Sequence, residues 1–160
     1  MLCGSFRNNL VEEVKVNKEL ERVSRRLQRV AKSKRKAAAA GMLREARLKL
    51  PTTFSFSLDY RMAVSGFVYS ECRTMDSKKV PLWLTCTNAQ PATQDLMVMF
   101  KCGDDLRQDV LTLQLISLMD ELWLAAGLDL RMTVYKVIAT RDMVGMIEIV
   151  LDSATTERIN

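Results

Sequence analysis

Apolar residues recur at every third or fourth position along the first fifty residues of the chain. This spacing is typical of an amphipathic helix. It predicts one helix or two over residues 10–50, with a break near Gly41 and an end at Pro51, because a proline pushes the preceding residue out of the helical region. We expect the apolar stripe to pack on a neighbouring domain, since it is too short for a stable coiled coil. The stripe consists of Val16, Leu20, Val23, Leu27 and Val30.

Beyond a connector over residues 51–66, the pattern changes from helical to extended. Runs rich in β-branched and aromatic residues predict strands over residues 67–74, 82–87 and 96–101. A short polar loop, residues 75–79, separates the first two of these strands.

A second apolar stretch predicts a helix over residues 106–126. Asp104 or Asp105 is expected to cap its start, and Gly127 is expected to follow its last turn. Its apolar residues occupy more than one side, so much of its circumference is expected to be buried. These residues are Leu111, Leu115, Leu118, Met119, Leu122 and Trp123.

Two more strands, over residues 131–139 and 143–150, complete the predicted elements. The order of elements indicates an α+β fold: an antiparallel five-stranded sheet with one long apolar helix packed on it. A basic helical segment, residues 1–50, precedes it, and residues 67–160 form the sheet-containing part.

The net charge of +5 is unevenly distributed along the chain. Residues 1–50 hold fourteen Lys and Arg against five Glu, whereas the remaining residues hold ten against fourteen acidic residues. The run Lys32-Ser33-Lys34-Arg35-Lys36 is compatible with two interpretations, a solvated helix face or a surface that attracts phosphates of acidic lipid or nucleic acid. Charge alone does not decide between them.

Histidine is absent from the sequence, and the four cysteines form no CxxC motif. The lack of histidine excludes Ser-His and Cys-His nucleophile pairs and most catalytic zinc sites. The N-terminus lacks the apolar core of a secretory signal, so an intracellular protein with reduced thiols is expected.

Lys101 is the clearest candidate for chemistry on spacing alone. It ends an apolar strand directly before a glycine and two aspartates. A lysine there can reach a phosphate, with Asp109 on the next helix as its partner. A solvated lysine at a strand end is the alternative. The loop Asp76-Ser77-Lys78-Lys79 contains no glycine, so it is neither a Walker loop nor a protein-kinase glycine loop.

The run Val98-Met99-Phe100-Lys101-Cys102-Gly103-Asp104-Asp105-Leu106-Arg107-Gln108-Asp109 resembles the signature of phosphatidylinositol 3- and 4-kinases. Residues 71–84, ECRTMDSKKVPLWL, resemble the phosphate loop of class I phosphatidylinositol 3-kinases, and residues 127–132, Tyr135 and 145–150 resemble the strands that lead to the interlobe hinge. Residues 1–65 resemble, more weakly, the end of the helical domain and the first helix of the kinase domain. The resemblance implies the N-terminal lobe of a protein-kinase-like fold.

The resemblance also implies a role in ATP binding for ten residues. Lys101 would contact the phosphates, and Ser77 and Lys79 would belong to the loop that covers them. Asp109 and Tyr135 would line the back of the pocket. The adenine would meet the backbone of Glu148 and Val150. Apolar walls for the purine would come from Met75, Trp83 and Ile147.

In the complete enzyme the family transfers the ATP γ-phosphate to the 3-hydroxyl of phosphoinositides. The resemblance implies ATP and Mg²⁺ as cofactors, and a phosphoinositide membrane and a regulatory subunit as partners. It implies no nucleic acid, and a cytoplasmic enzyme recruited to the inner face of the plasma membrane. The sequence ends ten residues after Val150, before the family's catalytic, metal-binding and activation loops, so we expect no catalytic or metal-binding residue in this chain and no activity from it alone.

Two departures from class I bear on the subclass. Val80 stands where a basic residue is usual, and Lys136-Val137-Ile138 replaces Gly-Cys-Leu. Class II and class III 3-kinases are therefore close alternatives. A 4-kinase is less compatible with residues 75–84. A non-enzymatic interaction module that binds acidic membrane or a partner through its basic helix is the alternative from another class.

Overall fold

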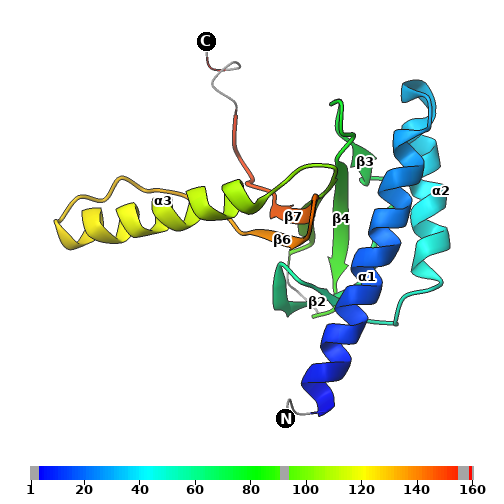
Figure 1. Ribbon diagram of the computed structural model, residues 1–160, viewed down its shortest axis with the longest axis horizontal. Helices are drawn as coiled ribbons and strands as arrows, with labels where there is room; N and C mark the ends of the chain where they lie inside the picture. The colour runs from blue at the N-terminus through cyan, green and yellow to red at the C-terminus, as the bar shows by residue number, and fades with distance from the viewer. Residues whose placement is uncertain (1–3, 91–93, 155–158, 160) are drawn as a thin grey trace.

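The computed structural model of the chain describes residues 4–90, 94–154 and 159. Two helices and a short 3₁₀ turn precede the strands of an antiparallel sheet, and a third helix lies between the fifth and sixth strands in the sequence (Figure 1). The elements are α1 (Gly4–Gln28), η1 (Lys32–Lys34), α2 (Arg35–Arg47), β1 (Phe54–Phe56), β2 (Asp59–Phe67), β3 (Arg73–Thr74), β4 (Leu82–Asn88), β5 (Leu96–Cys102), α3 (Arg107–Ala125), β6 (Val137–Arg141) and β7 (Val144–Glu148). The prediction of an α+β fold is confirmed.

The sheet has seven strands in its described part, in the order β1-β2-β4-β5-β7-β6, with β3 paired to β4. The expected number was five. All pairs are antiparallel. Side chains alternate between the faces of a strand, and in β5 every second residue is buried while those between are partly exposed. One face of the sheet therefore carries the core.

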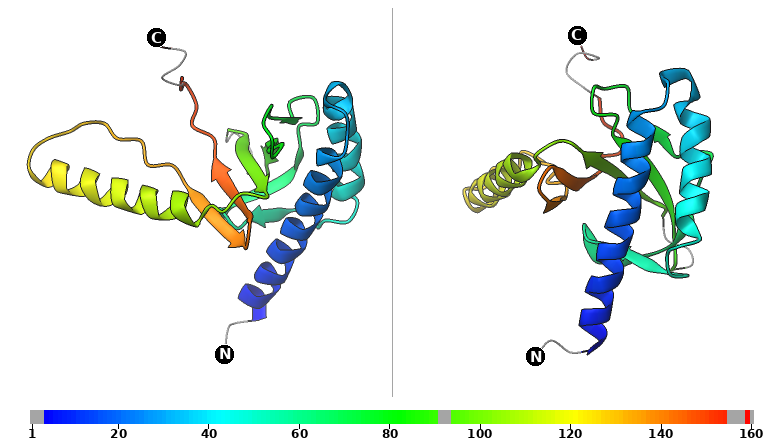
Figure 2. Two further views of the ribbon diagram at one scale, coloured as in Figure 1. Left: turned by 45° about the horizontal axis from the view of Figure 1, so that its top comes forward. Right: turned by 45° about the vertical axis from the view of Figure 1, so that its right-hand side comes forward.

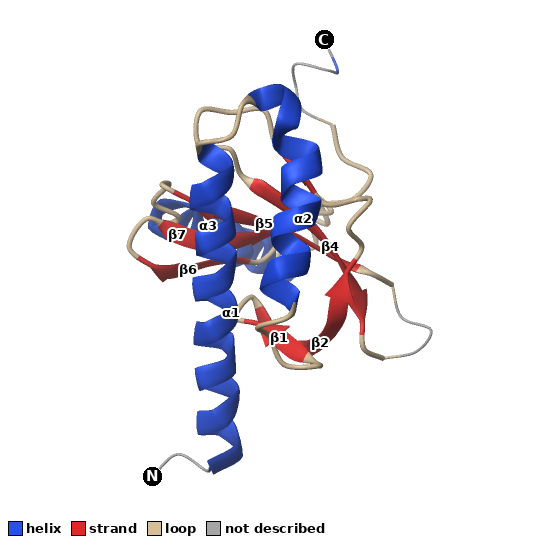
Figure 3. Ribbon diagram, turned by 90° about the vertical axis from the view of Figure 1, so that its right-hand side faces the viewer, coloured by secondary structure: helices blue, strands red, loops and turns tan. Residues whose placement is uncertain are grey.

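Helices α1 and α2 cover this core face (Figure 3). Val16, Leu20, Val23 and Leu27 are fully buried there, and each such side chain stabilises the fold by about 1.5–3 kcal/mol relative to exposure. The stripe thus packs on the chain's own sheet, and helices and sheet share one core.

The helical break lies at residues 29–34 and not near Gly41, which is inside α2. Ala31 takes an extended backbone conformation, with ψ at 138°, and this turns the chain so that α2 packs on α1. Glu45 of α2 accepts hydrogen bonds from Arg22 and Arg26 of α1. Glycine lowers helix stability by about 1 kcal/mol, which the packing of α2 outweighs.

The expected connector over residues 51–66 contains β1 and most of β2, which pair as a hairpin. The sequence pattern did not predict these two strands. Their pairing is irregular, since the register shifts both where β2 pairs with β1 and where it pairs with β4. Phe54, Phe56 and Val64 nevertheless reach the core. Residues 67–74, expected as a single strand, instead form the end of β2, a turn and the short β3.

Helix α3 forms as predicted but is not buried as predicted. It projects away from the sheet and lies near it only at its first turns and at β6 (Figures 1 and 2). Leu113 is its one buried residue, whereas Leu111, Leu115, Leu118 and Leu122 are 51–61% exposed. Gly127 follows the helix with a φ of 79°, as expected for that position. The N-cap residue is Leu106 and not Asp104 or Asp105 as predicted, and Asp105, just before it, accepts a hydrogen bond from the backbone N–H of Arg107.

The return from α3 is mostly extended chain without strand pairing. Residues 128–136 are irregular, and β6 begins only at Val137. Cys72, Cys86 and Cys102 are buried and free, while Cys3 lies outside the described residues. In the described part of the chain, no helix combines the length and apolar character needed to span a membrane.

Candidate ATP-binding site

Lys101 lies near the end of β5, on the sheet face opposite α1 and α2. Its neighbours Phe100 and Cys102 point into the core, so alternation places the Lys101 side chain on the other face. Its Nζ lies 3.4 Å from Oδ2 of Asp104. The expected partner, Asp109, is not the residue that pairs with it.

A continuous row of side chains crosses this face next to Lys101. Trp83 of β4 is opposite Met99 of β5, and Met99 is opposite Ile147 of β7. Directly paired residues of antiparallel strands project from the same face. The structure therefore brings together Trp83, Ile147 and Lys101, three of the residues predicted for the site. Met99, between them, was missed, although its position two residues before Lys101 is a usable signal.

The polar loop between β3 and β4 approaches the end of β5. The Lys79 side chain lies along Gly103, because a Cβ built at Gly103 would be 3.4 Å from Lys79 Cδ and 3.7 Å from Nζ. Gly103 has a φ of 100°, a conformation that favours glycine. The glycine after Lys101 and Cys102 thus allows the loop lysine to come close to the strand that carries Lys101.

The other predicted loop residues, Met75 and Ser77, lie on the outer part of the loop. Met75 donates its backbone N–H to the carbonyl of Pro81, and Ser77 donates its own to the carbonyl of Met75. The Ser77 side chain is exposed. A loop of this kind leaves hydroxyl and ammonium groups free to meet phosphate oxygens.

Asp109 and Tyr135 line one cavity of about 310 Å³ between the start of α3 and the return segment. The resemblance assigns both residues to the back of an ATP pocket, and that role stays a prediction. Trp83 lines a different cavity of about 430 Å³, at the β3 edge of the sheet. There the guanidinium of Arg73 stacks 4.1 Å from the Trp83 ring centroid.

The backbone of Glu148 lies at the end of β7. Its N–H donates to the carbonyl of Lys136, and its carboxylate accepts from the N–H of Lys136 at 2.8 Å. Its neighbour Ile149 instead donates to Met97 of β5, so the backbone of Glu148 faces away from β5. Val150 follows, and its carbonyl accepts a hydrogen bond from Ser153 Oγ.

Two carboxylates are held in their charged form by neighbouring cations. The Arg107 side chain lowers the pKa of Asp105 to about 2. At the start of β2, hydrogen bonds from Arg61 and then from Lys136 hold the pKa of Asp59 well below its usual range. Lys136, which departs from the class I pattern, directly precedes β6, and its ion pair with the buried Asp59 holds the start of β6 next to β2.

Nothing among the described residues forms a metal site of three or more His, Cys, Asp or Glu side chains. Asp104 and Asp105 pair with Lys101 and Arg107, so their negative charge is already balanced by protein cations. We derive no metal-dependent step from this chain.

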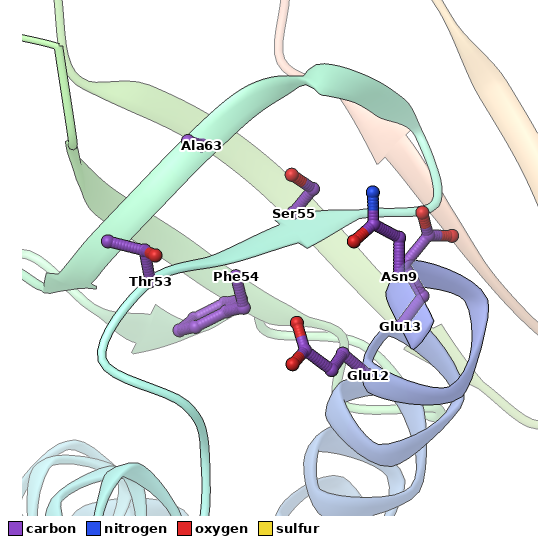
Figure 4. A pocket seen from close by; sticks show the side chains of 7 residues that line it. All are labelled: Asn9, Glu12, Glu13, Thr53, Phe54, Ser55 and Ala63. Atoms are coloured by element: carbon purple, nitrogen blue, oxygen red, sulfur yellow. The ribbon is translucent and has the colours of Figure 1, made fainter. Parts of the chain in front are cut away.

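A further cavity of about 150 Å³ lies between the start of α1 and the β1–β2 hairpin, and none of the ten predicted site residues lines it. Figure 4 shows Glu12 turned toward Phe54, with Asn9 and Glu13 beside it. Two glutamates without an interleaved cation would repel a polyphosphate. The cavity does not suit a nucleotide.

Comparison with known proteins agrees with the motif. The sequence model of the family "Phosphatidylinositol 3- and 4-kinase" matches residues 95–160. The chain is 42% identical to phosphatidylinositol 3-kinase 2 of Dictyostelium discoideum over 99% of its length and 8% of that protein. It is 41% identical to phosphatidylinositol 3-kinase 1 of the same organism, over 98% of the chain and 10% of the relative. A human relative, phosphatidylinositol 4-phosphate 3-kinase C2 domain-containing subunit beta, is 41% identical over 61% of the chain and 6% of its own length.

The chain thus spans about a tenth or less of the relatives that it matches. The family model covers β5, α3, β6 and β7, and the two Dictyostelium relatives also cover β4. The chain belongs to the phosphatidylinositol 3- and 4-kinase family and carries part of its kinase domain.

Proposed function

We propose that this chain forms the ATP-binding N-terminal lobe of a phosphatidylinositol 3-kinase. The complete enzyme would transfer the γ-phosphate of ATP to the 3-hydroxyl of a phosphoinositide at the inner face of the plasma membrane, in complex with a regulatory subunit. Family membership supports a lipid kinase that uses ATP. The preference for phosphatidylinositol 3-kinases rests on the relatives that cover nearly the whole chain.

One observation carries the proposal: Lys101 lies two residues beyond Met99 of the Trp83–Met99–Ile147 row, and the Lys79 side chain lies along Gly103, two residues after Lys101. The two ammonium groups would neutralise phosphate oxygens, and the row would offer an apolar surface to the purine. In phosphoryl transfer the protein contributes chiefly position and charge neutralisation. We assign the Mg²⁺ ligands and the catalytic residues to another part of the complete enzyme.

The test is Lys101→Met in the full-length enzyme that contains residues 1–160. Loss of one preorganised cation at the transferred group should lower kcat/KM for ATP about 100-fold or more. Lys78→Met is the control, because Lys78 is an exposed lysine of the nearby β3–β4 loop and is not among the ten residues assigned to the site. Activity that survives Lys101→Met, or falls equally in Lys78→Met, would refute the role of Lys101.

The chain of 160 residues by itself should bind ATP weakly and phosphorylate no lipid. It supplies one wall of the proposed site, and an interlobe pocket needs two. Isothermal titration with ATP and a radiometric lipid assay check this expectation. Micromolar affinity, or turnover that disappears in Lys101→Met, would contradict it.

A further inference from the structure

Gln28, the last residue of α1, joins two segments of the proposed nucleotide site. Its side-chain amide nitrogen donates to the backbone carbonyl of Lys79 at 3.0 Å and to that of Cys102 at 3.0 Å. Lys79 belongs to the β3–β4 loop, and Cys102 directly follows Lys101 in β5. One carboxamide therefore spans the loop and the strand that carry the two proposed phosphate-binding lysines.

The geometry uses both protons of the amide. A glutamine NH₂ group can donate two hydrogen bonds, and here each goes to a different backbone segment. A single bridge of this kind sets how far apart its two acceptors lie. Because Lys79 and Cys102 are 51 and 74 residues from Gln28 in sequence, the bridge links α1 to distant parts of the chain.

The loop needs such an external contact. Its internal backbone hydrogen bonds run from Ser77 to Met75 and from Val80 to Ser77. Val80 has a φ of 52°, which is unfavourable for a β-branched residue. A loop that contains this conformation persists only where its surroundings hold it. The buried Val80 side chain and the Gln28 bridge both do so.

Two other residues near Gln28 in the sequence also link the N-terminal helices to distant segments. Lys32 of η1 forms an ion pair with Asp76 in the loop, and Glu21 of α1 accepts a hydrogen bond from Arg141 at the end of β6. The Lys32–Asp76 pair is exposed on both sides, so it contributes little. Of the two bonds that Gln28 donates, the one to Cys102 is partly buried and the one to Lys79 is exposed, so the bridge is anchored at β5 and reaches out to the loop.

We propose that Gln28 is a positioning residue for ATP binding: it fixes the distance between the phosphate loop and β5, and it couples the placement of α1 to the nucleotide site. This inference rests on the proposed function, since it assumes that Lys79 and Lys101 meet the phosphates. A shift of α1 along its axis would move the Lys79 carbonyl and loosen the loop. Gln28 does not itself touch the nucleotide.

Three substitutions separate the donor role of Gln28 from its volume. Gln28→Met keeps the length without a donor, Gln28→Glu keeps the shape but faces two carbonyl oxygens with a negative charge, and Gln28→Lys retains donors. Arg29→Met is the control, as its side chain is the adjacent exposed cation at the end of the helix.

Hydrogen–deuterium exchange of the full chain is the first measurement. Loss of the bridge should raise exchange at the amides of residues 77–80 several-fold in Gln28→Met and further in Gln28→Glu, with Gln28→Lys and Arg29→Met near wild type. Equal exchange in all variants would overturn the inference, whatever the chain binds.

Steady-state kinetics of the full-length enzyme is the second. KM for ATP should rise roughly three- to thirtyfold in Gln28→Met, the equivalent of one to two net hydrogen bonds. KM for the lipid should stay unchanged, and Gln28→Lys should restore most of the affinity for ATP. A general loss of stability would instead lower the active fraction and leave both KM values unchanged.

The outcomes keep the two proposals apart. If Lys101→Met abolishes activity while Gln28→Met leaves KM for ATP unchanged, the positioning role is refuted and the ATP-binding function stands. If Lys101→Met has no effect but the loop exchanges faster in Gln28→Met, the bridge exists and its role in ATP binding falls with the proposed function.

Discussion

Gly145 of β7 occupies a position with no room for a side chain. It pairs with Lys101 on one side and with Ala139 of β6 on the other. A Cβ built there would lie 2.7 Å from Leu106 Cδ1 and 3.1 Å from Ala139 Cα, and it would overlap the carbonyl oxygen of Ile138 more severely still. We therefore expect Gly145→Ala to destabilise the fold.

The size of the effect follows from which atoms can move. Carbon atoms pack best at about 3.5–4.0 Å, so the contact with Leu106 is nearly an ångström too short, but a rotamer change can relieve it. The Ile138 oxygen belongs to the backbone, and only a shift of β6 or β7 relieves that overlap. Overpacking costs about 1–3 kcal/mol, and the rigid partner places Gly145→Ala near about 3 kcal/mol. For a chain of this size, that corresponds to a fall in Tm of about 6–12 °C.

Thermal unfolding of the chain, followed by circular dichroism, measures the effect. Gly66→Ala in β2 is the matched control, since nothing lies within 4 Å of a Cβ at that position. Alanine in a strand interior is favoured over glycine by about 0.5–1 kcal/mol, so the control should be neutral or slightly stabilising. A Tm for Gly145→Ala within 1–2 °C of wild type, about 0.5 kcal/mol, would refute the packing of β6 against β7.

The remaining predictions concern acid stability and the exposed helix. Because its cationic partners lower the folded pKa of Asp59, its stabilisation is present above about pH 4, the unfolded pKa, and is lost as the pH falls toward the folded value. Urea unfolding at pH 6 and pH 3 should show a larger loss for wild type than for Asp59→Asn, and parallel losses would contradict the assignment. On α3, Leu115→Gln with Leu118→Gln should change stability by less than about 0.5 kcal/mol and reduce self-association in light scattering. Leu113→Ala, at the buried position, should lower the free energy of unfolding by about 2 kcal/mol. Equal losses of stability for the double change and for Leu113→Ala would contradict the exposure of Leu115 and Leu118.

The sequence predicts what depends on period and local chemistry. Four of the five stripe residues lie in α1 and are buried, because a 3.6-residue period places their side chains on one face whatever covers them, whereas Val30 lies beyond the end of the helix. Gly127 ends α3 because a left-handed residue is required there. The break between α1 and α2 was misplaced, since it is set by packing between two helices and not by the local preference of glycine.

Features that depend on distant partners were not predictable in the same way. Residues 111–122 look like a buried helix, yet burial requires a covering surface that the described chain does not provide. In the site, the family signature identified Lys101, and the alternation around it could have added Met99. Nothing local identifies Gln28, because a glutamine at a helix end looks like an ordinary solvated residue until its two carbonyl partners are known.

The common core of helices and sheet has a consequence for synthesis of the protein. Helix α1 is synthesised before β5, but its apolar stripe packs in part against that strand, which begins at Leu96. About 70 residues separate the two, and at roughly 5–20 residues per second the stripe waits for roughly 4–14 seconds before its partner strand exists. During that interval α1 and α2 can shield only part of each other. A nascent chain that pauses between residues 50 and 95 would therefore present an apolar helix pair to chaperones, and folding should complete in one step once β5 and β7 have been made.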